Sequence, residues 1–201
     1  MFISDDLCWF PSVLLWRLSY KTSQIWEIAN KRLLASFMGH TDAIRSLDVS
    51  PDGRLLVTGS NDGSVRIWKM RDGSSRVLST GRSLFTSVRF SPNGRYVAAS
   101  NFDRFLRIWN VRSGQLVGKW TDPEGIIRCM AFTPNGEVLV SGCWDGMIRS
   151  WGVSSLNAPA RSRLSTDERI WEPGTLAKEY ERPEPDKYTV SLLCALIAFV
   201  P

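Results

Sequence analysis

Residues 61–68 read Asn-Asp-Gly-Ser-Val-Arg-Ile-Trp, and their pattern of Asp, Arg and Trp returns twice further along the chain. It recurs as Phe-Asp-Arg-Phe-Leu-Arg-Ile-Trp at residues 102–109 and as Trp-Asp-Gly-Met-Ile-Arg-Ser-Trp at residues 144–151. Each Asp stands six residues before its Trp, and the copies are 41 or 42 residues apart. A fixed period of this length is typical of a repeat architecture.

A turn signal repeats with the same period. Pro-Asp-Gly at residues 51–53 is followed by Pro-Asn-Gly at residues 92–94 and 134–136. Proline and glycine favour tight turns, and short apolar runs flank each of these three turns. A further turn after each of the first two copies of the Trp leads to a fourth short run. The pattern predicts a four-stranded antiparallel sheet repeated along the chain.

The predicted fold is all-β, with successive sheets stacked as blades, because one such sheet cannot cover its own apolar faces. We expect a degenerate partial blade over residues 1–38, whose first eleven residues do not form a first strand. Three repeat units follow over residues 39–153. Residues 154–188 form a charged, Pro-containing insertion between strands, or alternatively a solvated linker without a specific role. Residues 189–201 supply the first strand of a further, truncated blade.

These features resemble the WD-repeat β-propeller family. The residues that carry the resemblance are Gly39-His40 at the start of a unit, the turn Asp62, and Ile67-Trp68 at its end. The resemblance implies a buried network in which imidazole, hydroxyl and indole groups satisfy the turn carboxylate. In the first unit it implies a network of His40, Thr58 or Ser60, Asp62 and Trp68.

The later units keep only part of this pattern. Gly81 and Pro123 stand where the first unit has His40. The position of Ser60 is taken by Asn101 and Cys143. The resemblance therefore implies partial networks there, built on Asp103 with Trp109 and on Asp145 with Trp151.

The number of repeat units determines whether the blades can close into a complete propeller. The family's propellers commonly close with about seven units of about 40–45 residues each, more than this chain holds. We expect an incomplete propeller, and three explanations stay open. The chain is a fragment of a larger propeller, it assembles with a second chain, or its last strand returns to complete the first blade and close four.

The second unit carries a narrower resemblance. Residues 96–104, followed by Leu-Arg-Ile-Trp at residues 106–109, resemble the propeller of fungal Tup-type transcriptional corepressors. The resemblance implies a nuclear adaptor that bridges DNA-bound repressors to silencing machinery. The alternative is an architectural or substrate-receptor subunit of another complex, such as a ubiquitin ligase or a signalling scaffold.

Composition limits the chemistry. The chain has 201 residues, of which 43% are hydrophobic and 22% are charged, a globular composition. It has one histidine, His40, and four cysteines without Cys-x-x-Cys spacing. A Gly-rich phosphate loop is absent from the sequence. We therefore expect a protein that is not an enzyme, with no metal and no cofactor, in which His40 is a structural donor rather than a general base.

A candidate binding site comes from the residues that precede each turn Asp, namely Asn61, Phe102 and Trp144. Family resemblance implies that these loops face one end of the propeller, where partners dock. Exposed aromatic side chains are preferred anchors in interfaces. We expect a partner site built from Phe102, Arg104 and Trp144, with Asp42 and Arg128 nearby. The alternative is that the two aromatics only pack on neighbouring loops.

Net charge and hydropathy bear on the class of partner. The formal charge of +5 is not concentrated in a basic stripe, so direct binding of nucleic acid is the weaker hypothesis. The apolar run at residues 190–200 is too short to span a membrane, and the start of the chain lacks a signal-peptide pattern. We expect an intracellular protein whose partners are other proteins, nuclear if the corepressor resemblance holds and otherwise cytoplasmic.

Overall fold

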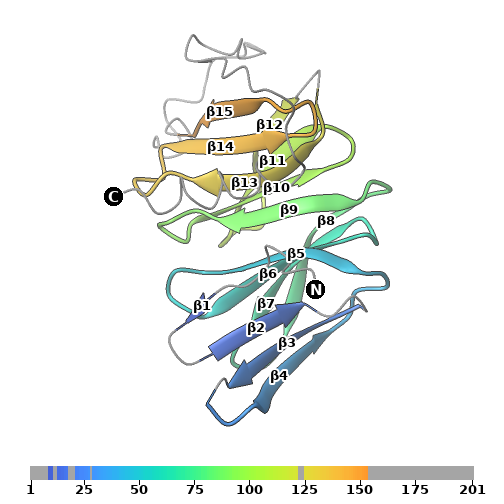
Figure 1. The fold of residues 1–201 in the computed structure, drawn as a ribbon, viewed down its shortest axis with the longest axis vertical. Helices are drawn as coiled ribbons and strands as arrows, with labels where there is room; N and C mark the ends of the chain where they lie inside the picture. The colour runs from blue at the N-terminus through green and yellow to red at the C-terminus, as the bar shows by residue number, and fades with distance from the viewer. Residues whose placement is uncertain (1–8, 11–12, 18–20, 28, 122–124, 154–201) are drawn as a thin grey trace.

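The computed structural model describes residues 9–10, 13–17, 21–27, 29–121 and 125–153. All regular secondary structure within these ranges is β-strand, arranged as antiparallel sheets that follow one another along the molecule (Figure 1). The predicted all-β fold of four-stranded antiparallel blades is confirmed. The insertion predicted at 154–188 and the strand predicted at 189–201 lie outside the described residues.

The first sheet contains β1 to β4 in consecutive order. Their bounds are Trp9–Phe10, Val13–Arg17, Thr22–Glu27 and Arg32–Met38. The two-residue strand β1 pairs with β2 and corrects the expectation that the first eleven residues hold no strand. So short a strand is beyond the reach of a hydrophobic pattern, because alternation needs at least four residues to show.

The next two sheets are complete four-stranded units, each in consecutive order. One consists of β5 (Ile44–Val49), β6 (Leu55–Ser60), β7 (Ser64–Lys69) and β8 (Ser75–Thr80). The other consists of β9 (Phe85–Phe90), β10 (Tyr96–Asn101), β11 (Phe105–Asn110) and β12 (Leu116–Thr121). The described part of the last sheet contains β13 (Ile127–Phe132), β14 (Val138–Cys143) and β15 (Ile148–Gly152). The described sheets do not close into a ring.

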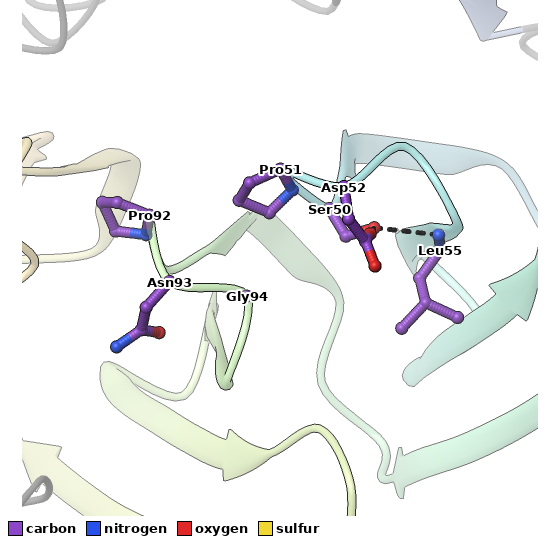
Figure 2. Close-up of a pocket in the computed structure, with 7 residues that line it drawn as sticks. All are labelled: Ser50, Pro51, Asp52, Leu55, Pro92, Asn93 and Gly94. Atoms are coloured by element: carbon purple, nitrogen blue, oxygen red, sulfur yellow. Dashed lines mark hydrogen bonds between the residues drawn. The ribbon is translucent and has the colours of Figure 1, made fainter.

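The Pro-Asx-Gly turns join the first two strands of these three sheets. In the first, the Asp52 carboxylate accepts hydrogen bonds from the Ser50 hydroxyl at 2.5 Å and from the Arg54 backbone N–H at 3.1 Å. Gly53 closes the turn with a φ of 70°, which glycine adopts without steric penalty. Equivalent turns of adjacent sheets lie side by side and border a small pocket of about 170 Å³, lined by Pro51, Pro92 and their neighbours (Figure 2).

The hydrophobic core lies between the sheets rather than within them. One cluster joins Val57 and Ile67 of the second sheet to Val88, Phe90 and Trp109 of the third. Similar clusters fill the spaces on either side, so each sheet is covered by its neighbours. Burying a side chain of this size stabilises the fold by about 1.5–3 kcal/mol. Stacking therefore supplies the burial that a lone sheet lacks.

The innermost strands of adjacent sheets are also hydrogen-bonded through side chains. Ser46 and Asp48 of β5 accept hydrogen bonds from the backbone N–H groups of Val88 and Phe90 of β9, at 3.1 and 2.7 Å. The second contact lies two residues after the first on both strands, so β5 and β9 run in the same direction. Equivalent loops of successive sheets therefore meet at the same end of the molecule, which is where the candidate site lies.

Candidate functional site

Three equivalent turns carry the repeated aspartates, each joining the second and third strands of its sheet. In every case one carboxylate oxygen accepts the backbone N–H two residues further on, at 2.8 to 3.0 Å. The pairs are Asp62 with Ser64, Asp103 with Phe105, and Asp145 with Met147. Each carboxylate thus stabilises its own turn locally, and its second oxygen is available for a further partner.

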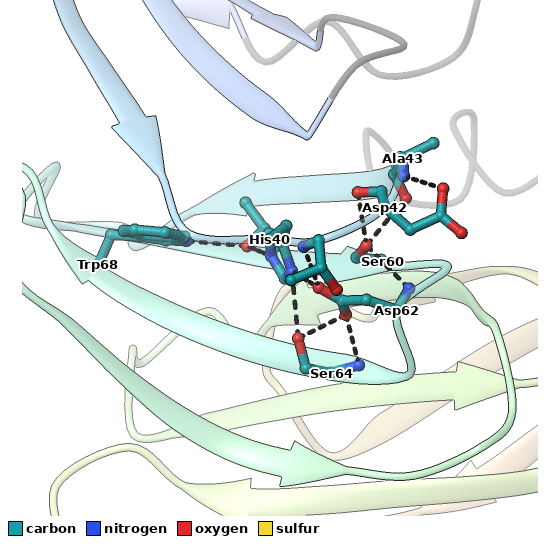
Figure 3. Close-up of polar contacts among 9 residues, drawn as sticks. His40, Asp42, Ala43, Ser60, Asp62, Ser64 and Trp68 are labelled. Atoms are coloured by element: carbon teal, nitrogen blue, oxygen red, sulfur yellow. Dashed lines mark hydrogen bonds and ion pairs between the residues drawn. The ribbon is translucent and has the colours of Figure 1, made fainter.

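In the first unit that further partner is His40, at the centre of a buried chain of hydrogen bonds (Figure 3). His40 Nδ1 lies 2.8 Å from Asp62 Oδ2, and His40 Nε2 lies 2.7 Å from the Thr58 hydroxyl. The Trp68 indole N–H donates to the same hydroxyl at 2.8 Å. The Ser64 hydroxyl donates to Asp62 Oδ1 at 2.6 Å. The structure thus brings together His40, Thr58, Asp62 and Trp68, and it adds Ser64.

The partners determine the tautomer of His40. Because the Asp62 carboxylate can only accept, Nδ1 carries the proton, and Nε2 accepts the Thr58 hydroxyl proton. Burial lowers the pKa of His40 below its usual range, and the hydrogen bond and charge of Asp62 oppose that shift only in part. The imidazole is therefore neutral near pH 7. Its side chain has no exposed surface, as a structural donor requires.

Asp62 responds to the same surroundings in the opposite sense. Burial acts to raise the pKa of its carboxyl, but the hydrogen bonds from Ser64, Thr41 and His40 outweigh burial and hold the pKa below its usual range. The carboxylate stays ionised, with donors on both oxygens. A buried charge that is fully hydrogen-bonded rigidifies the turn around it.

Ser60 has a different role from Thr58, although either residue fits the expected hydroxyl. Its hydroxyl contacts the backbone carbonyls of Asp42 and Ala43 at 3.0 Å, and it accepts the Asp62 backbone N–H at 3.1 Å. It therefore fastens the loop before β5 to the Asp62 turn. Thr58 alone joins the imidazole to the indole.

In the later units, arginines replace the missing histidine. Arg107 contacts both oxygens of Asp103, at 3.1 and 2.5 Å, and Arg149 contacts Asp145 at 2.7 Å. Burial acts to raise the pKa of both carboxyls, but the hydrogen bonds from these arginines and from the backbone N–H groups of Phe105 and Met147 together outweigh burial, and the pKa of each lies below its usual range. In the first unit the equivalent Arg66 instead lies over the Trp68 ring, 5.8 Å from its centroid. The recurrence of Arg four residues after each Asp is the sequence signal for this pairing.

The tryptophans of the later units differ from each other. The Trp151 indole donates to the Ser141 hydroxyl at 2.8 Å, as Trp68 does to Thr58. The second unit has Ala99 at the position of Thr58, and the side chain of Ala99 cannot accept a hydrogen bond. Trp109 is buried in the cluster between the second and third sheets. Apolar packing therefore holds Trp109 in place, whereas Trp151 also keeps its hydrogen bond to Ser141.

The predicted aromatic pair lies at the same end of the sheets as these turns. Phe102 and Trp144 are 38% and 57% exposed, and their rings meet edge to face with centroids 5.5 Å apart. Their backbone N–H groups donate to Leu84 and Ile126, in the loops that enter β9 and β13. The two side chains thus pack on each other across two adjacent blades and still present apolar surface to solvent.

The remaining predicted contact residues are exposed at three separate places in the fold. Arg104 and Arg128 are exposed, in the β10–β11 turn and on β13. Asp42 is exposed in the loop before β5, where its carboxylate accepts the Ala43 backbone N–H at 2.6 Å. Asn61, the counterpart of the two aromatics, accepts a hydrogen bond from Arg45. We refer to Phe102, Trp144, Arg104 and Arg128 as the aromatic surface.

Comparison with known families accounts for the repeated pattern. The family described as "WD domain, G-beta repeat" matches residues 31–69, 74–110 and 114–152. The chain belongs to the WD-repeat family. Each matched WD repeat begins at the outermost strand of one blade and ends in the third strand of the next, the first of them running from β4 to β7. One repeat therefore links two adjacent blades covalently.

Several curated proteins are similar to parts of this WD-repeat chain. Protein groucho of Drosophila melanogaster is 40% identical over 65 residues, 28% of this chain and 9% of that protein. Ribosome biogenesis protein ERB1 of Debaryomyces hansenii is 50% identical over 52 residues, 26% of this chain and 5% of its own length. Small ribosomal subunit protein RACK1 of Caenorhabditis elegans is 30% identical over 70 residues, 35% of this chain and 22% of that protein. The matches span less than a quarter of each relative.

The described residues lack two further kinds of feature. No cluster of three or more His, Cys, Asp or Glu side chains in this part of the WD-repeat chain is arranged to hold a metal ion. Within the described ranges there is also no helix with the length and apolar character needed to cross a membrane.

Proposed function

We propose that this chain is a non-enzymatic WD-repeat scaffold that binds other proteins through the aromatic surface. The observation that supports the site is the exposure of Phe102 and Trp144 at one end of the blades, in contrast to Trp68 and Phe85, which are 1% exposed. Exposed aromatic side chains at a rigid surface are favoured interface anchors. The turn aspartates and His40 act as structural groups rather than as reacting ones.

Within that role, we propose a corepressor-type adaptor in transcriptional regulation, located in the nucleus. The resemblance of residues 96–109 to Tup-type propellers supports this assignment. The competing role is an architectural or substrate-receptor subunit of another intracellular complex. It is favoured by partial similarity to proteins named for ribosome biogenesis and for the small ribosomal subunit. Either role is compatible with further blades, or a second chain, that close the propeller.

Proximity labelling in the source cell tests both the proposed role and the proposed docking site. The full chain is compared with a Phe102→Ala, Trp144→Ala double variant that retains its thermal melting profile. Enrichment of nuclear transcription factors supports the adaptor, whereas a ligase, kinase or ribosomal assembly supports the competing role. Loss of the enriched partners in the double variant supports the site. An unchanged set of partners with an intact fold refutes the aromatic surface as the docking site.

A further inference from the structure

The junctions between adjacent sheets inside the chain follow one pattern. The Trp of the third strand faces the preceding sheet, as Trp68 does where it meets Phe37 of β4 edge to face, with ring centroids 5.8 Å apart. Trp109 is likewise buried in a cluster with Val57 and Ile67 of the sheet before it. Each junction therefore joins two different faces. We call the face that bears the third-strand Trp the tryptophan face, and the opposite one, which bears Val57 and Ile67 in the second sheet, the aliphatic face.

The tryptophan face of the first sheet has no sheet before it among the described residues. Trp26 of β3 holds the position of Trp68, 42 residues earlier in the chain. Trp68 and Trp109 are almost fully buried in their four-stranded sheets, whereas Trp26 is only half-buried. The indole N–H of Trp26 donates to Gln24 of its own strand at 3.2 Å. This face thus keeps its tryptophan without the neighbour that covers it elsewhere.

The aliphatic face of the last sheet is open in the same way. Val140 of β14 and Ile148 and Ser150 of β15 occupy positions that lie in the core of the second and third sheets. The residues at those positions are all buried, namely Val57, Val65, Ile67, Ala98, Leu106 and Ile108. In the last sheet Val140 is half-buried, Ser150 is exposed, and Ile148 is 37% exposed. The last sheet therefore presents apolar surface where the earlier sheets bury it.

From these features we propose that two copies of this chain bind head to tail. The aliphatic face of the last sheet of each copy packs on the tryptophan face of the first sheet of the other. These faces are the two halves of a junction that recurs between the sheets of one chain, so they are complementary through the repeat itself. They lie at opposite ends of the stack of sheets (Figure 1), and the described sheets do not close into a ring, so a second copy supplies the missing half.

The geometry of such a contact favours a closed dimer. A contact between two different faces leaves one unused half on each copy, and it gives a ring if the rotation closes. Two copies with four described sheets each contain eight sheets, which lies within the range of about four to eight blades in known propellers. Once the first junction has formed, the second is intramolecular and is favoured by the high effective concentration of its halves. We therefore expect one two-chain species.

Size-exclusion chromatography with light scattering tests the dimer on the full chain at several protein concentrations. We expect the mass of two chains. A mass of one chain at every concentration would overturn the proposal, because the open faces are then covered by other residues of the same chain or need no cover. A series of larger species would also overturn it, because the junctions then form an open chain of molecules rather than a ring.

Two single variants distinguish a head-to-tail contact from a contact between identical faces. Ile148→Lys places a charge on the aliphatic face, and Trp26→Lys places one on the tryptophan face. Each should reduce the mass to that of one chain, since both junctions of the ring use both faces. Leu116→Lys is the control, because Leu116 is 49% exposed on β12, in a sheet that has a neighbour on each side. The control should remain a dimer.

Mixing the two variants provides the decisive readout. The mixture still contains one intact face of each kind, so a two-chain species joined by one junction should return at high concentration, which neither variant forms alone. A dimer that survives either single variant, or a mixture that stays at the mass of one chain, would overturn the head-to-tail arrangement.

This dimer is independent of the proposed docking site, since neither face includes a residue of the aromatic surface. The Phe102→Ala, Trp144→Ala double variant should therefore remain a dimer. Loss of cellular partners in that variant with an unchanged mass supports the docking site alone. A monomeric wild-type chain whose partners still depend on these two residues refutes only the dimer.

Discussion

Thr58→Val is the most informative change in the buried network, because valine keeps the shape of threonine and removes only its hydroxyl. That hydroxyl accepts the Trp68 indole N–H at 2.8 Å and donates to His40 Nε2 at 2.7 Å. Thr58 is fully buried, so water cannot replace the lost group. The variant leaves two buried polar groups without a partner.

The size of the effect follows from those two groups. An unsatisfied buried polar group costs about 1–3 kcal/mol. The additional methyl group of valine recovers part of that through apolar burial. We expect the free energy of unfolding to fall by about 2–4 kcal/mol, a large fraction of the 5–15 kcal/mol that is typical of a domain.

Urea denaturation of the full chain, followed by circular dichroism, measures this change. Ser141→Ala is a matched comparison, because Ser141 is also fully buried but its loss removes the acceptor of one indole only, that of Trp151, which is itself partly buried. We expect about 1 kcal/mol for Ser141→Ala, since water reaches a partly buried indole more easily. If Thr58→Val cost no more than Ser141→Ala, the description of His40, Thr58 and Trp68 as one connected network would be refuted.

Three further outcomes follow from the same geometry. The pKa of His40 is below its usual range, so the unfolded chain takes up that proton first. Stability should therefore fall as the pH drops below about 6.5, and pH titration of the melting temperature should show a flatter slope for His40→Asn. Arg107→Ala leaves the partly buried carboxylate of Asp103 without its ion pair and should cost about 1–3 kcal/mol in urea denaturation, against no measurable change for Arg71→Ala. Arg104→Gly relieves a left-handed residue but gives the unfolded chain more freedom, so its free energy of unfolding should rise by about 0.5–1 kcal/mol; a marked loss would contradict the strain described here.

The repeat made most of the strands predictable from sequence. Period, turn residues and alternation are local signals, and three copies of them reinforce one another. The strand Trp9–Phe10 was not predicted, because two residues are too few to show an alternation of apolar and polar side chains. The sequence also did not show which of Thr58 and Ser60 contacts His40. Both residues carry a hydroxyl, and residues two apart in a strand face the same side.

Contacts between units were harder to predict than the units themselves. The exposure of Phe102 and Trp144 followed from their place before each turn Asp, but their mutual contact depends on how adjacent blades stack. The pairing of Arg107 with Asp103 likewise depends on a geometry that differs from that of Arg66, which lies over Trp68. Side-chain direction within a loop is determined by packing, which a single sequence does not display.

We propose that Phe102 and Trp144 form a partner-docking site rather than a self-contained structural contact. Affinity purification from the source cell, with mass spectrometry, tests it on the wild-type chain, on Phe102→Ala with Trp144→Ala, and on a control with two other exposed apolar side chains replaced. Val77→Ala with Leu116→Ala is that control, since these residues are 41% and 49% exposed on the outer strands β8 and β12. We expect the specific partners to disappear with the first pair of changes and to persist with the second. Partners that persist in a folded Phe102→Ala, Trp144→Ala variant would contradict it.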